Sequence, residues 1–136
     1  MVIKVLLWIV QTLLALLFVF AGVMKLVTPI EAMPMPVHLS GLFIKFIGVA
    51  EVLGAVGLIL PVLLRIQPWL TPLAAAVLVV IMAGATVITA MSGPLAPALF
   101  PLATGLLCAW VADRRRRMEP FPAIDTRRAV DAAHAA

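Results

Sequence analysis

The sequence predicts an all-α integral membrane protein, a bundle of four transmembrane helices. Hydrophobic residues make up 65% of the 136 residues and charged residues only 12%, whereas soluble domains average about 45–50% and 25%. Four long apolar runs occupy residues 5–27, 42–61, 69–91 and 96–112. Each is close to the roughly 20 residues that a helix needs to cross a bilayer. We therefore expect a transmembrane domain at 1–112 and a basic cytoplasmic tail at 113–136.

The first apolar run is closed by Lys25 and by Thr28 and Pro29. It is too long for the core of a signal peptide, and no small-x-small cleavage site follows it, so a retained helix is expected. One stripe of this helix is more polar and smaller than the rest, and it consists of Gln11, Ala15, Phe18, Gly22 and Lys25. Because these residues recur every three or four positions, they share a face, which should turn toward the bundle.

Prolines mark the boundaries of the remaining helices. The segment 29–40 contains three prolines and is expected to be a loop, because proline removes a backbone donor and restricts the residue before it. Pro61 should begin the exit from the second helix into a short turn, and Ser92 to Pro94 should end the third. The tail from Glu119 has too few apolar residues for a core and is expected to be disordered or loosely helical.

The orientation follows from the placement of lysine and arginine. Lys4, Arg65 and the run Arg114–Arg117 fall at one side of the predicted bundle, and the two opposite loops contain no lysine or arginine. The positive-inside rule therefore predicts an N-in/C-in topology. The arginine run should also attract anionic lipids. Since the basic excess lies mostly in the tail, nucleic acid is not an expected partner.

Glu51 is the acidic residue at the centre of the second run. It lies nine residues from Leu42 and from Leu60, which places it roughly 13 Å deep, near the bilayer midplane. Small residues surround it and would form a notch for helix packing: Gly22, Gly48, Gly54, Ala55 and Gly57. An intramembrane carboxylate needs a partner, a proton or water. Two interpretations stay open, a proton- or ligand-binding acid and a structural acid bonded to neighbouring helices.

Counting residues from the outer helix ends predicts the depth of other groups relative to Glu51. Phe18, Met82 and Gly105 are expected at its level, whereas Lys25 is expected roughly 10 Å shallower. A direct ion pair between Lys25 and Glu51 would then require helix tilt or a bridging water.

These depths lead to a hydrated, outward-facing pocket with Lys25 near its mouth and Glu51 at its floor. Thr86 or Thr104 should lie beside the acid, since both can donate a hydroxyl across helices, and Gln11 should lie beneath it. The polar residues assigned to the pocket are Glu51, Lys25, Gln11, Thr86 and Thr104. No metal site is expected, because His38 is a lone loop histidine and His134 falls on the other side of the membrane.

Three segments carry a family resemblance: Phe20–Leu26, Ile47–Pro61 and Trp69–Ala75. With them, the chain from Leu6 to Ala112 resembles the DoxX-like family of small four-helix membrane proteins. The resemblance implies a bacterial inner-membrane protein. It also implies a link to quinone-dependent sulfur oxidation or to oxidative-stress complexes, as in some relatives.

Two classes of function remain. In the first, the notch around Glu51 accepts a quinone or another small amphiphile, and a partner oxidoreductase carries the electrons, since the chain offers no haem, flavin or iron–sulfur ligands of its own. In the second, Glu51 is the titrating group of a small proton-coupled transporter. A third possibility is a structural or assembly partner of another membrane protein. A homo-oligomer is the alternative to a partner oxidoreductase. No catalytic constellation is recognised, and Cys108 is expected to be a packed apolar residue.

Overall fold

The computed structural model describes residues 1–33, 39–118 and 126–136, and every regular element in them is helical. In order these are α1 (Val2–Val27), the 3₁₀ turn η1 (Ile30–Ala32), α2 (Gly41–Leu64), α3 (Leu70–Met91), the 3₁₀ turn η2 (Ala96–Ala98), α4 (Leu99–Met118) and α5 (Thr126–Ala135). Four of the described segments are long and apolar enough to cross a membrane: α1, α2, α3, and η2 with α4. The predicted all-α, four-span architecture is confirmed. Its orientation in the membrane stays a prediction.

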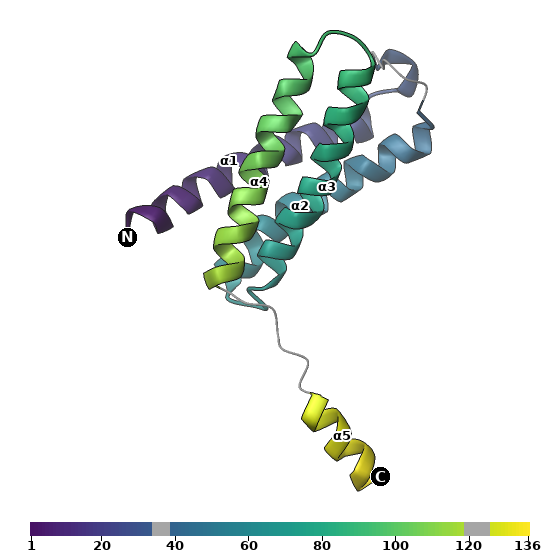
Figure 1. Ribbon diagram of the computed structural model, residues 1–136. Helices are drawn as coiled ribbons and strands as arrows, with labels where there is room; N and C mark the ends of the chain where they lie inside the picture. The colour runs from purple at the N-terminus through teal and green to yellow at the C-terminus, as the bar shows by residue number, and fades with distance from the viewer. Residues whose placement is uncertain (34–38, 119–125) are drawn as a thin grey trace.

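Two antiparallel hairpins make up the bundle (Figure 1). Helix α1 packs along α2 and α3 packs along α4, while contacts between α2 and α3 join the hairpins. In the view of Figure 1 the first hairpin runs obliquely across the steeper second one. We call the end that holds the N-terminus, the α2–α3 turn and the end of α4 the terminal end, and the opposite end the loop end.

Two helices run further than their sequence boundaries suggest. Helix α2 continues past Pro61 to Leu64, and a left-handed Arg65 (φ 56°) then closes it, with the Ile66 amide donating to the Pro61 carbonyl. Helix α4 continues past Ala112 to Met118, where Asp113 pairs with arginines one turn later. Part of the expected tail is therefore helical. Residues 119–125 lie outside the described part of the chain.

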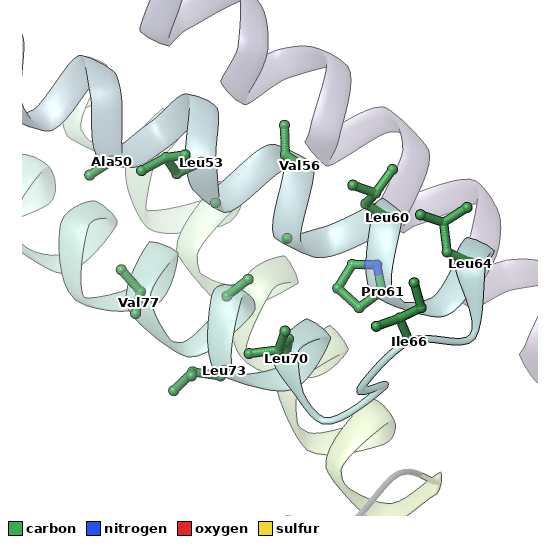
Figure 2. Close-up of a pocket in the computed structure, with 13 residues that line it drawn as sticks. Ala50, Leu53, Val56, Leu60, Pro61, Leu64, Ile66, Leu70, Leu73 and Val77 are labelled. Atoms are coloured by element: carbon green, nitrogen blue, oxygen red, sulfur yellow. The ribbon is translucent and has the colours of Figure 1, made fainter.

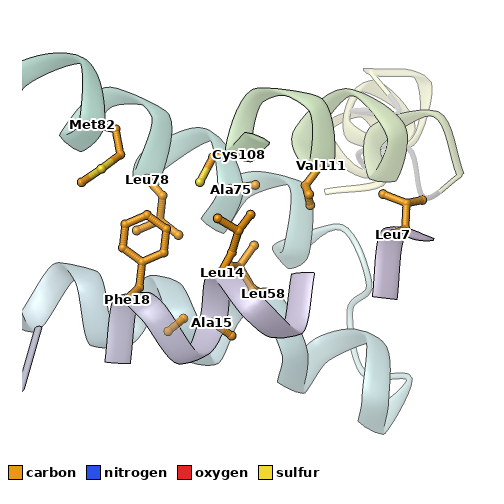
Figure 3. Close-up of a cluster of buried hydrophobic side chains, with 11 residues drawn as sticks. Leu7, Leu14, Ala15, Phe18, Leu58, Ala75, Leu78, Met82, Cys108 and Val111 are labelled. Carbon is orange, nitrogen blue, oxygen red and sulfur yellow. The ribbon is translucent and has the colours of Figure 1, made fainter. Parts of the chain in front are cut away.

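The core is a layer of apolar side chains shared by all four spanning helices (Figure 3). Phe18 of α1 lies close to Leu78 of α3 in this view, with Met82 beyond them. Cys108 of α4 is fully buried in the same cluster, as expected for a packed apolar residue. The core fixes the spacing of the helices that carry the polar residues described below.

The outer surface of the spans is also apolar. Large aliphatic and aromatic side chains such as Leu13, Phe46, Val80 and Leu106 are more than half exposed. Exposed apolar patches of this extent would drive aggregation in water, whereas they suit contact with lipid chains. No residue of α5 is buried.

Candidate functional site

The candidate site is an ion pair between α1 and α2. The Lys25 Nζ atom donates to Glu51 Oε2 at 2.8 Å. The Glu51 side chain is almost fully buried, whereas 33% of the Lys25 side chain is exposed. Glu51 is therefore enclosed by the protein, whereas part of the Lys25 side chain is accessible from outside it.

Two glycines bring the helices close enough for this pair. A Cβ atom added to Gly22 would lie 2.7 Å from the Gly48 carbonyl oxygen, and one added to Gly48 would lie 3.0 Å from the Gly22 oxygen. Contacts this short exist only because neither residue has a side chain. The Cβ atom added to Gly48 would also lie 3.1 Å from the Lys25 Cβ atom, so Lys25 lies about one helical turn from Glu51.

The direct ion pair corrects the depth expected from the sequence. That count placed both helix ends at the same level and Lys25 roughly 10 Å above Glu51. In the structure Lys25 lies beside Gly48, which is three residues, or about 4.5 Å, from Glu51 along α2. The long lysine side chain spans this offset without a bridging water. Gly22, which also meets Val52, lies nearest the level of the acid on α1, so Phe18 is about one turn further from the loop end than expected.

The small residues around Glu51 serve two neighbouring helices rather than one. Gly48 faces α1, whereas a Cβ atom on Gly54 would lie 2.7 Å from Leu78 of α3. One turn further along α2, Gly57 meets Ala74 of α3 in the same way. Ala55 is 2% exposed. Glu51 thus lies in the part of α2 where the α1 and α3 contacts come together.

The two threonines do not donate to the acid. The Thr86 hydroxyl donates to the Met82 carbonyl at 2.7 Å, and the Thr104 hydroxyl donates to the Phe100 carbonyl at 2.9 Å. A hydroxyl has one proton, so each is used within its own helix. Such bonds to the preceding turn satisfy threonine in an apolar setting. The hydrated pocket around Glu51 stays a prediction.

Gln11 belongs to a second polar cluster, closer to the terminal end. Its buried amide donates to the Leu58 carbonyl of α2, and its oxygen accepts a bond of 2.9 Å from Arg115 Nε of α4. The Arg115 guanidinium also lies over the Trp8 ring, 5.2 Å from its centroid. Gln11 therefore joins three helices at the end of the bundle opposite Lys25.

Sequence reasoning missed the role of Arg115. The sequence pattern predicts a role in topology and in anionic-lipid attraction for the whole run Arg114–Arg117, yet Arg115 is only 3% exposed, while the other three arginines are exposed. Helical periodicity could have predicted that Arg115 is buried, because it shares a face with Val111 and Cys108, four and seven residues earlier, which are core residues. The predicted fourth helix ends at Ala112, so Arg115 is not expected on the same helix as these core residues.

A large apolar groove lies outside both clusters, between α2 and α3 (Figure 2). Its volume is about 540 Å³, and it extends from Ala50 and Val77 to Pro61, Leu64 and Ile66 near the α2–α3 turn. Neither Glu51 nor Lys25 lines it.

No group of three or more histidine, cysteine, aspartate or glutamate side chains is placed to hold a metal ion within residues 1–33, 39–118 and 126–136. His38 lies outside these residues.

Comparison with known families covers most of the bundle. The model of the DoxX-like family matches residues 9–111, which include all of α2 and α3, most of α1 and α4, the Lys25–Glu51 pair and Gln11. The chain belongs to the DoxX-like family. The resemblance noted in the three sequence segments is thereby confirmed, and this DoxX-like chain is a multi-pass membrane protein. No curated protein and no solved structure matches it.

Proposed function

We propose that this DoxX-like protein binds the head group of a quinone, or of another small amphiphile with a carbonyl-type acceptor, at the Lys25–Glu51 pair. In this proposal it is an accessory subunit in a bacterial inner membrane, and a partner oxidoreductase carries the electrons. The observation that supports the proposal most is the unequal burial of the pair, with Glu51 enclosed and Lys25 a third exposed.

The chemistry of the exposed partner suits such a head group. A lysine ammonium has three N–H donors, and one of them is directed to Glu51. The other two are available to an acceptor that enters from the exposed side. Glu51 would hold the ammonium in place and balance its charge, which is costly to leave uncompensated in an apolar setting.

The test is saturable binding of decylubiquinone to the purified protein in nanodiscs, measured by equilibrium dialysis. Lys25→Met should weaken binding by about tenfold or more, the range for loss of a charge-assisted hydrogen bond. Lys45→Met is the matched control, because Lys45 is an exposed cation near the same end of the bundle. Absence of saturable binding, or equal losses in both variants, would contradict the proposal.

A second measurement, on the same purified protein, distinguishes the transporter alternative from quinone binding. Reconstituted in liposomes with an internal pH-sensitive dye, the protein should carry no proton flux above that of empty liposomes. A flux that Glu51→Gln abolishes would instead favour a proton-coupled carrier that uses Glu51 as its titrating group.

A further inference from the structure

The groove between α2 and α3 has the dimensions of a site for one lipid chain. Along α2 its lining runs from Ala50 to Leu64, which is about 21 Å at the helical rise. One leaflet with its head-group region is about 20–22 Å thick, so the groove is about as long as one leaflet is thick. Its volume of about 540 Å³ falls within the range of small-molecule sites.

The shape of the groove follows from the residues at its base. Gly54 and Gly57 let α2 approach α3 at Leu78 and Ala74. Bulkier side chains, among them Leu53, Leu60, Leu73 and Val77, form much of the remaining lining. Figure 2 shows Pro61, Ile66 and Leu70 gathered where the turn closes the groove. All these side chains are apolar, so the groove itself offers nothing to a polar head group.

The basic residue Arg65 lies next to the groove, at the terminal end. Arg65 lies between two lining residues, Leu64 and Ile66, in the left-handed conformation that ends α2. Its side chain is exposed, and it makes no ion pair with any residue in the described part of the chain. An apolar groove about as long as one leaflet is thick, with an exposed arginine next to its end, is complementary to an anionic lipid.

We propose that the α2–α3 groove binds one acyl chain of an anionic phospholipid, whose phosphate pairs with Arg65. This site is separate from the Lys25–Glu51 pair, because neither Lys25 nor Glu51 lines the groove. A second copy of the chain or a helix of another protein is the competing occupant, but neither would supply the phosphate that Arg65 can bind.

The test uses phosphatidylglycerol with a photoreactive diazirine on one acyl chain, diluted into phosphatidylcholine nanodiscs that hold the full-length protein. Mass spectrometry should place the adducts within 50–64 and 70–77. Arg65→Gln should lower this labelling about fivefold, the effect of one cation near an anionic membrane. Arg65→Lys should restore most of it. Lys4→Gln, which removes another exposed cation from the same end, should leave it unchanged.

Three results would overturn the proposal. Adducts spread evenly over the four helices would show ordinary lipid contact without a site. Equal labelling with diazirine-tagged phosphatidylcholine, or equal labelling of the Arg65→Gln variant, would show that Arg65 does not bind the lipid phosphate. A cross-linked dimer through α2 and α3 that excludes the lipid would assign the groove to a second copy.

Discussion

Gly22 and Gly48 lie in backbone contact across α1 and α2, and this crossing places Lys25 within 2.8 Å of Glu51. The ion pair thus depends on two residues that have no side chains. Helix packing through small residues is usual in membranes, where lipid already surrounds apolar side chains and close van der Waals contact provides the attraction.

The first prediction concerns this crossing. Gly22→Ala should destabilise the bundle by about 1–3 kcal/mol, because the new methyl group meets the Gly48 backbone oxygen, which cannot move aside alone. Thermal unfolding in detergent, followed by circular dichroism, measures the loss. Gly84→Ala is the control, since a Cβ atom there meets nothing within 4 Å and alanine favours the helix. Equal stability of the two variants would rule out a tight crossing.

A graded result is expected at the other glycine contact. Gly54→Ala should cost less than Gly22→Ala, because its new methyl group meets only side-chain atoms of Leu78, which can shift more readily than the backbone oxygen that Gly22→Ala meets. Gly54→Leu cannot be absorbed in this way and should cost roughly 1–3 kcal/mol. The same unfolding measurement checks the order. A fully stable Gly54→Leu bundle would mean that this face of α2 does not pack on α3.

The Lys25–Glu51 pair should behave as a coupled unit. Lys25→Met leaves an acid in an apolar site without its partner, and Glu51→Gln leaves an ammonium without its counter-charge. The double variant leaves neither, so it should be less destabilised than the sum of the single variants, with a coupling of about 0.5–3 kcal/mol. A double-mutant cycle of unfolding free energies measures this. Strict additivity would mean that the two groups do not interact in the folded protein.

Much of this arrangement follows from sequence pattern alone. Four apolar runs divided by prolines predict the spans, and the central carboxylate predicts a buried polar group. The position of Lys25 could not be predicted, because it depends on the relative shift of two helices, and this shift is set by which glycines meet. The sequence does not show that Gly48 of α2 contacts Gly22 of α1 rather than another small residue. Likewise, the depth of Thr86 and Thr104 in the bundle does not predict that their hydroxyls donate to carbonyls of the preceding turn rather than to Glu51.

Arg115 provides a prediction about the terminal end. Arg115→Met should lower the unfolding free energy by about 1–3 kcal/mol, because it leaves the buried Gln11 oxygen without its donor and removes the contact with Trp8. Arg114→Met changes the same residue type one position earlier, at an exposed site, and should have little effect. Comparable losses in the two variants would show that the run acts only through its charge.

The topology is tested by cysteine labelling in intact cells. Cys108 is buried and is first replaced by alanine. A membrane-impermeant maleimide should then label Gly93→Cys, at the loop end, but not Arg128→Cys, beyond α4. Labelling of position 128 from outside would contradict the expected cytoplasmic placement of both termini.

The most direct test of the central proposal is the position at which a quinone binds. A photoreactive azidoquinone, irradiated with the wild-type protein in nanodiscs and mapped by mass spectrometry, should label residues near Lys25 and Glu51 in α1 and α2. Excess decylubiquinone should suppress these adducts, and Lys25→Met should remove them. Adducts confined to the α2–α3 groove and insensitive to Lys25→Met would contradict a head-group site at the ion pair.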